Sequence, residues 1–427
     1  MRYFPFDVSL LRLGEPLPVS LWDDRGTLLL PRGAVMRDDA QRRRLAARKP
    51  QVRSDDHDRL LGPWLLAMEQ MVLRDEPLGR IAGLRPREVE SPTAAATPLP
   101  VPEVDPLDLL GDLQMHLRKT LHDPKSEDFT DRLMRDADAL TDLMREDPDA
   151  SLLVLLHDAA RDSLEYGVHH SLVVAAVSAL VAIEHPAVWP QADIQRLALA
   201  GLTMNLSVLS LHDQLAAQEE DLSDQQRTEL KAHGLRSAQL LRQVGFVDEA
   251  LLLTVALHHH VAPQPSVDSV AGLAPELASR YRARLIHKVD AYTAKLSPRR
   301  QRPGMSATQA ARSAFLDRNG DTDPVGSWVL KTIGLYPPGT LVMMRNGEAG
   351  IVHSRGPRAH APWVAVLVSA SGLPLSRPHL VDTGEESRAV VQAMTPSQLR
   401  VQVPLHAVLA LKPKRSPQDE ASTDSSC

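Results

Sequence analysis

Apolar residues recur three and four positions apart through most of the middle of the chain. Leu133, Ala137, Leu140 and Met144 follow this spacing, and the segment 151–185 continues it as SLLVLLHDAARDSLEYGVHHSLVVAAVSALVAIEH. Such a spacing matches the 3.6-residue period of a helix and places the apolar side chains on one face. The pattern predicts helices from about 107 to 335 and excludes strands through SLVVAAVSALVAIEH.

The segments on either side of this region alternate apolar and polar residues instead. Near the N-terminus, LGEPLPVSLWDDRGTLLLPRGAVM surrounds the turn signal Asp-Asp-Arg-Gly, which predicts a β-hairpin. Beyond residue 335, Pro-Pro-Gly, Asn-Gly and Gly-Pro interrupt a second alternating stretch, as is typical of short strands joined by turns. We therefore expect a mainly α protein, a helical bundle flanked by small N-terminal and C-terminal β-containing domains.

Proline-rich and polar stretches set the expected domain boundaries. The segment 85–106, RPREVESPTAAATPLPVPEVDP, is too polar and too rich in proline to bury a core. The expected parts are a small β-containing domain at 1–60, a helix and proline-rich linker at 61–106, the helical bundle at 107–335, a small β module at 336–415 and a disordered tail at 416–427.

Composition narrows the class of protein. Lysine and arginine are mixed with acidic residues along the 427-residue chain, and the net charge is −6, which gives no overall basic surface for nucleic acid. The basic stretch QRRRLAARKPQVR is interpreted as a solvated face. One cysteine, Cys427, excludes a disulfide framework and fits a reducing compartment. We expect a cytoplasmic protein with neither a signal peptide nor a membrane span.

Candidate chemistry lies in the histidines of the helical region. His170 and His233 follow apolar helical spacing, and a run of three histidines begins at His258 and includes His259. Neutral imidazole is the commonest metal ligand. Asp290 lies between apolar neighbours, where a carboxylate is costly unless it is paired or metal-bound. The alternative for each lone histidine is a core side chain satisfied by a hydrogen bond.

The order and spacing of these motifs resemble the HD-GYP family, bacterial phosphodiesterases that hydrolyse cyclic di-GMP within a helical HD-type bundle. The resemblance spans roughly 166–311 and rests on YGVHHS, LSDQQRTELKAHGLRSAQLL, HHH in place of His-His-Glu, and VDAYTAKLSPRRQRP. It implies that a divalent ion such as Fe or Mn, one at most, is held by His170, His233, His258, His259 and Asp290. His260 stands in the place of the glutamate. The basic turn SPRRQRP, with Arg299, Arg300 and Arg302, is a candidate for binding phosphate or an acidic partner.

The chain departs from the family pattern at the motif LLHDIGK. A gapless count places Met204 and Asn205 where the family has its His-Asp pair, and Val208 where it has lysine. The Gly-Tyr-Pro loop is replaced by VAPQPSVDSVAG. Two other His-Asp pairs, at 157–158 and 212–213, are interpreted as surface or cap residues. Asn205 offers a neutral amide and cannot bridge two dications as an aspartate does.

Three functions remain open on this basis. The first is a catalytically impaired regulatory or scaffold protein in cyclic di-GMP signalling, which binds cyclic di-GMP or a signalling protein such as a diguanylate cyclase domain. The second is a metal-dependent phosphohydrolase with an altered metal site. The third is a helical interaction protein whose histidines only pack. The first two require His170, His233, His258 and Asp290 to converge on one cavity, with Met204 and Asn205 on its wall, and none fixes the oligomeric state.

Overall fold

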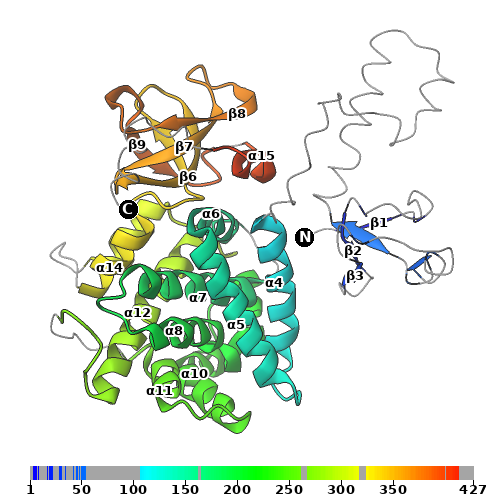
Figure 1. Ribbon diagram of the computed structural model, residues 1–427, viewed down its shortest axis with the longest axis vertical. Helices are drawn as coiled ribbons and strands as arrows, with labels where there is room; N and C mark the ends of the chain where they lie inside the picture. Colours follow the sequence, from blue (N-terminus) through cyan, green and yellow to red (C-terminus); the bar gives the residue numbers. More distant parts are fainter. Residues whose placement is uncertain are drawn as a thin grey trace, which may run out of the picture. The chain divides into compact units, whose positions relative to one another are not determined.

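The computed structural model describes residues 106–412 apart from 162–164, 261–266, 317–323 and 400, together with scattered residues among the first 53 (Figure 1). The chain divides into two compact units, Met1–Glu103 and Val104–Cys427, and each is considered by itself. Most of the expected linker, the tail and half of the segment that replaces the Gly-Tyr-Pro loop lie outside the described residues. The expected domain boundaries therefore stay predictions.

The first unit contains a small antiparallel sheet with the strand order β1-β4-β2-β3. The expected hairpin corresponds to β2 (Leu21–Trp22) and β3 (Leu28–Leu30), which pair antiparallel. Strands β1 (Tyr3–Pro5) and β4 (Gln51–Arg53) complete the sheet. Its small core gathers Leu17, Val19, Leu21, Leu45 and Val52.

The second unit opens with the helices that the apolar spacing predicts, and the mainly α fold class is confirmed. Leu133, Ala137, Leu140 and Met144 are all fully buried along one helix. The helices are α4 (Pro106–His122), α5 (Phe129–Glu146), α6 (Pro148–Ala159), α7 (Tyr166–Glu184), α8 (Gln191–Thr203), the 3₁₀ turn η2 (Leu206–Val208), α9 (Leu209–Ala217), α10 (Asp224–Gln243), α11 (Glu249–Leu257), α12 (Pro275–Leu296), α13 (Ala307–Phe315) and α14 (Pro324–Ile333).

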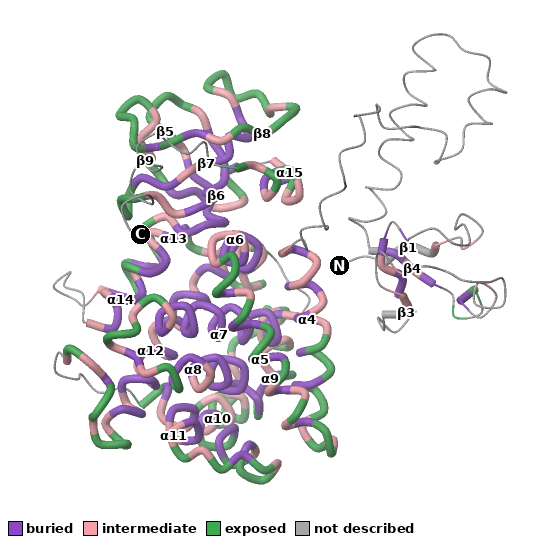
Figure 2. Tube along the Cα trace, viewed as in Figure 1, coloured by how far each residue is buried: buried purple, intermediate pink, exposed green. Residues whose placement is uncertain are grey.

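Helix α7 runs through the centre of the bundle, and nearly all of its residues are buried (Figure 2). By length and hydropathy alone, α7 and the segment Gln191–Ala217 could cross a membrane, but buried core helices meet the same criteria. The expectation that no segment spans a membrane stays a prediction. Within the bundle 94% of the apolar window of α7 is buried, as in the core helix of a globular fold.

A glycine allows α7 and α8 to pack closely. A Cβ atom added at Gly201 of α8 would lie 2.5 Å from the backbone nitrogen and Cα of Ala175 on α7. Contacts this short do not occur between real atoms, so the two backbones can approach only because position 201 has no side chain. This contact holds the middle of α7 against the end of α8, which leads directly into Met204 and Asn205.

A five-stranded antiparallel sheet follows the bundle, with the order β8-β7-β6-β5-β9. Arg355 on β6 forms ion pairs with Asp149 at the start of α6 and with Glu184 at the end of α7, and it donates to the carbonyl of Thr332. This guanidinium joins the sheet to the bundle, as does an apolar cluster in which Leu153 of α6 packs against the sheet. Its elements are β5 (Leu341–Met344), β6 (Ala349–Arg358), β7 (Ala361–Val368), β8 (Pro374–Asp382), η3 (Glu386–Arg388) and β9 (Val390–Met394), followed by α15 (Leu405–Leu409).

His157 on α6 is buried in the bundle, with only 3% of its surface exposed, so its interpretation as a surface or cap residue is wrong. Its Nε2 has no hydrogen-bond partner, and burial, followed by the charge of Arg161, lowers its pKa from 6.5 to about 4. As the pH falls below 6.5, His157 becomes protonated in the unfolded chain but stays neutral in the folded chain. Stability is therefore lost between about pH 6.5 and pH 4.

We expect His157→Leu to remove up to about 3 kcal/mol of this acid-induced loss, because the pKa difference between the two states disappears. Chemical denaturation of metal-free protein at pH 7 and at pH 4.5 measures the effect. His122→Leu, at an exposed position of α4, is the matched control. Equal acid sensitivity of native chain and His157→Leu would refute this assignment.

Candidate functional site

The site begins near the start of α7, where the buried side chain of His170 points into the bundle. Its Nε2 lies 2.8 Å from Oδ1 of Asp290 on α12, although 120 residues separate the two in sequence. Tyr166 lies one turn earlier, with its hydroxyl 3.3 Å from Nδ1 of His170. Burial alone would raise the pKa of Asp290, but the hydrogen bond from His170 and the neighbouring imidazoles outweigh burial and hold that pKa well below its usual range.

His233 on α10 and His258 at the end of α11 form the second part of the site. Nδ1 of His258 donates to the carbonyl of Val255 at 2.7 Å, and Nδ1 of His233 donates to that of Leu230. These bonds assign the proton of each neutral ring to Nδ1 and leave a lone pair on each Nε2. The two Nε2 atoms face each other at 3.0 Å.

Two lone pairs at this distance repel unless a cation lies between or beside them. Protonation is disfavoured there, since burial, followed by the neighbouring imidazoles, lowers the pKa of His258 to about 3, and burial also lowers that of His233. The ligand atoms of His233, His258 and His259 all lie within 4.8 Å of one another. Donors about 2 Å from one ion lie 3 to 4 Å apart, so the three imidazoles fit a divalent metal.

A cavity of about 470 Å³ opens beside these histidines. It brings residues from α9, α10 and α12 together with Asn205 just before η2, the end of the histidine run after α11, and the turn that follows α12. Its positive charges are Lys231 and Arg299, and Asp290 is the one carboxylate among the described residues that line it. The described lining residues are Asn205, His212, Leu215, Leu230, Lys231, His233, His259, His260, Asp290, Ala294 and Arg299.

The three arginines of the basic turn point in different directions. Arg299 lines the cavity, donates to the hydroxyl of Tyr166 at 3.0 Å and lies over that ring with its guanidinium carbon 5.0 Å from the centroid. Arg300 forms an exposed ion pair with Glu219, and Arg302 donates to the carbonyl of Ala294. Of the three predicted phosphate-binding or partner-binding residues, Arg299 is therefore the one that faces the cavity.

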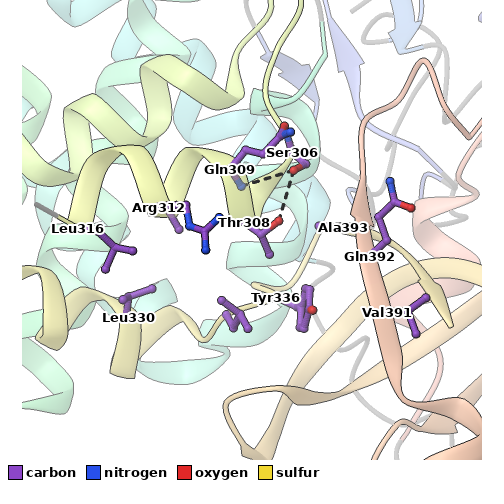
Figure 3. A pocket seen from close by; sticks show the side chains of 12 residues that line it. Ser306, Thr308, Gln309, Arg312, Leu316, Leu330, Tyr336, Val391, Gln392 and Ala393 are labelled. Carbon is purple, nitrogen blue, oxygen red and sulfur yellow. Dashed lines mark hydrogen bonds between the residues drawn. The ribbon is translucent and has the colours of Figure 1, made fainter. Parts of the chain in front are cut away.

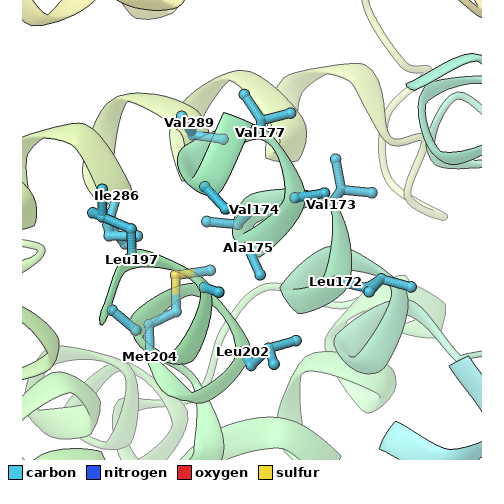
Figure 4. Close-up of a cluster of buried hydrophobic side chains, with 14 of the residues drawn as sticks. Leu172, Val173, Val174, Ala175, Val177, Leu197, Leu202, Met204, Ile286 and Val289 are labelled. Atoms are coloured by element: carbon cyan, nitrogen blue, oxygen red, sulfur yellow. The ribbon is translucent and has the colours of Figure 1, made fainter. Parts of the chain in front are cut away.

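The residues at the altered motif do not all face the cavity. Asn205 lines the cavity, as expected. Met204 is fully buried among apolar side chains such as Val174, Leu197 and Ile286 (Figure 4), so the expectation that it lies on the cavity wall is wrong. Val208, at the position of the family's lysine, is buried as well. Neither side chain offers a ligand or a charge to the cavity.

His212 is a site residue that the sequence interpretation missed. Its ring centroid lies 6.3 Å from that of His170 and 6.4 Å from that of His233, and its Nδ1 is buried without a partner. Burial, followed by the charge of His170, lowers its pKa to about 3. The cap interpretation holds for Asp213, whose Oδ1 accepts from the backbone nitrogen of Gly167 in the first turn of α7, but it is wrong for His212.

His287 is the second missed residue. It lies one turn before Asp290 on α12, and its ring centroid is 5.6 Å from that of His259. A spacing of three residues places both side chains on one face of a helix, so the sequence RLIHKVD contained a usable signal. His287, His259 and Asp290 form a second group whose ligand atoms lie within 4.8 Å of one another.

Another cavity, of about 520 Å³, lies between α13, α14 and β9 (Figure 3). Its described lining contains Arg312 and Tyr336 among mostly apolar and uncharged side chains, with no histidine and no carboxylate. A third cavity, of about 500 Å³ between α4 and α5, is lined by His116 and several carboxylates, but neither group of three potential metal ligands among the described residues lies there.

Fold and site together define a mainly helical protein with an HD-like cluster of imidazoles and one carboxylate. The chain is 31% identical over 233 residues to the cyclic di-GMP phosphodiesterase PA4108 of Pseudomonas aeruginosa. This match covers 52% of the chain and 53% of the relative, so the chain spans about half the length of the curated relative. It confirms the resemblance to the HD-GYP proteins that the order of the motifs indicates.

Two further comparisons complete the picture. No known family profile matches the chain. Among solved structures, Bd1817, an HDG"Y"P protein from Bdellovibrio bacteriovorus, matches with a TM-score of 0.41 and 13% identity over 77% of this chain and 99% of the other.

Proposed function

We propose that the chain is a regulatory protein that holds a divalent metal ion beside the cavity, binds cyclic di-GMP there and hydrolyses it slowly or not at all. The observation that carries the proposal is the altered motif, in which Asn205 faces the cavity while Met204 and Val208 are buried away from it. The histidine cluster is kept, but the groups that would turn binding into hydrolysis are replaced.

The metal part of the proposal rests on the facing Nε2 atoms of His233 and His258, 3.0 Å apart. These two imidazoles and His259 would hold the ion, with Asp290 beside His259 and hydrogen-bonded to His170. Imidazole with a nearby carboxylate suits ions such as Fe²⁺ or Mn²⁺. When bound, such an ion supplies Lewis acidity and lowers the pKa of a coordinated water.

The expectation of slow or absent hydrolysis follows from the small number of negative charges in the site. Phosphodiester hydrolysis at a site with two or more metal ions needs carboxylates to bridge them. Asp290 is the one carboxylate among the described cavity residues, and its Oδ1 is engaged by His170. The amide of Asn205 has no charge to offset a dication. A site of this composition retains affinity for a metal and a phosphate but stabilises the transition state poorly.

The nucleotide part rests on the size and charge of the cavity. A volume of about 470 Å³ lies within the range of small-molecule sites. Arg299 and Lys231 on its wall supply the positive charge that phosphodiester oxygens require. A bound nucleotide would contact α9, α10 and the turn after α12, and this surface is where a partner such as a diguanylate cyclase domain would sense occupancy.

We expect the full chain, loaded with Mn²⁺, to bind cyclic di-GMP while turning it over at least about 100-fold more slowly than the Pseudomonas relative assayed alongside, because several kcal/mol of transition-state stabilisation are missing. Calorimetry measures binding, and chromatographic detection of the linear dinucleotide measures turnover. Arg299→Gln should weaken binding by about tenfold through loss of a charge-assisted hydrogen bond.

Arg300→Gln is the matched control, since Arg300 is paired with Glu219 at the surface and its loss should leave binding unchanged. Turnover at the rate of the relative would contradict the impaired function and favour the second candidate, a metal-dependent phosphohydrolase with an altered site. His212 and His287, which add imidazoles to the cluster, favour that candidate. If the metal-loaded chain did not bind cyclic di-GMP, this nucleotide would be rejected as the ligand of the cavity.

A further inference from the structure

We propose that the chain has a second cation site, formed by His259, His287 and Asp290, which uses a histidine outside the HD-GYP ligand pattern. The inference rests on the proposed function in that the first ion is held by His233 and His258. The ligand atoms of the second group lie within 4.8 Å of one another, so small side-chain shifts bring them to the spacing of about 3 to 4 Å that one coordination sphere requires.

The state of the His287 ring supports this assignment. Its Nδ1 is buried and has no hydrogen-bond partner, while the ring bonds to the backbone of His258 through its other nitrogen. Metal-binding histidines are commonly held in this way, with one nitrogen donating to a carbonyl and the other left free for the ion.

Asp290 divides its two oxygens between the two sides of the cluster. Oδ1 accepts from His170 at 2.8 Å, whereas Oδ2 faces His259, 3.9 Å from its Nε2. The oxygen on the His259 side is therefore free to meet a cation. In a site with several carboxylates, each supplies only part of the negative charge. Here Asp290 is the one carboxylate among the described cavity residues, so it would supply most of the negative charge for the second ion.

His259 lies between the two groups and can complete either of them. Its ring centroid is 4.8 Å from that of His233 and 5.6 Å from that of His287, and 43% of its side chain is exposed. Each ion keeps two donors of its own, His233 and His258 for the first and His287 with Asp290 for the second. His287 would thus replace, in part, the metal ligand that the chain lacks at position 205.

The donor set also indicates which ions fit. Two imidazoles and one carboxylate suit borderline ions such as Co²⁺, Zn²⁺, Fe²⁺ or Mn²⁺, whereas Mg²⁺ prefers oxygen ligands in an octahedral shell. We therefore expect Co²⁺ to occupy both sites and Mg²⁺ to occupy neither. Co²⁺ is the useful probe because its visible absorption reports imidazole coordination independently of any turnover.

We expect the metal-free full chain to bind two Co²⁺ ions by calorimetry and by absorption titration. His287→Ala should bind one, with the dissociation constant of the remaining ion changed by less than about threefold. His122→Ala is the matched control, because His122 is exposed on α4 and belongs to neither group of three, and it should still bind two. His287→Gln, checked with His287→Ala by circular dichroism, covers a loss of folding in the alanine variant.

The outcomes separate the two proposals. One ion in the native chain and one in folded His287→Ala, with the same affinity, would overturn the second site and leave the proposed function intact. No ion in the native chain would overturn both. Loss of both ions in a folded His287 variant would also reject the second site as an independent one.

Discussion

Replacing His258 by leucine should weaken binding of the first metal ion by at least about 100-fold. One of the two facing Nε2 donors is lost, and a structural ligand contributes on the order of 3 kcal/mol to the total affinity of such a site. The remaining donors near that position are His233 and the half-exposed His259. Calorimetric titration of metal-free protein with Mn²⁺ or Co²⁺ measures the change.

The same variant has a second, independent readout. A ligand at 100 times its dissociation constant stabilises a protein by about 2.7 kcal/mol, so metal should raise the melting temperature of the native chain but not that of His258→Leu. Without metal, the variant should be at least as stable as the native chain, because the facing lone pairs are gone. A native chain that melts at the same temperature with and without metal would reject the site.

Gly201→Ala should destabilise the second unit by about 3 kcal/mol or more. The added methyl group would lie 2.5 Å from the backbone of Ala175, and the backbone cannot rotate away as a side chain can, so α7 and α8 must move apart. Denaturant unfolding measures the loss. At an open helical position the same substitution would stabilise by about 1 kcal/mol, so an increase in stability would refute the close contact.

Local spacing predicted the helices and half of the site. The burial of Leu133 and Leu140 follows from a 3.6-residue period, which depends only on neighbours along the chain. His170 and Asp290 were candidates because each is a polar group within an apolar stretch, where a partner is needed. Their contact at 2.8 Å supplies that partner. Whether a metal joins them stays a prediction.

His212 and Met204, on the two sides of η2, could not be placed from the sequence. Met204 precedes this turn and still has the helical backbone of α8. After it the chain passes through the 3₁₀ turn η2, which changes the direction of the following side chains relative to a continuous helix. Counting along the motif placed Met204 on the cavity wall, but it packs into the core. The same turn brings His212 back to the site from a position that had no periodic signal.

Because Arg355 comes late in the sequence, a helical bundle that forms during synthesis does so before this arginine is available. The ribosome reaches it 206 residues after Asp149 and 171 residues after Glu184, the two carboxylates that it joins. Glu184 is the last residue of α7, at the end of the helix where the macrodipole is already negative. A nascent chain that has completed the bundle therefore carries unfavourable charge at the end of its central helix, and that charge is neutralised only after β6 has left the ribosome.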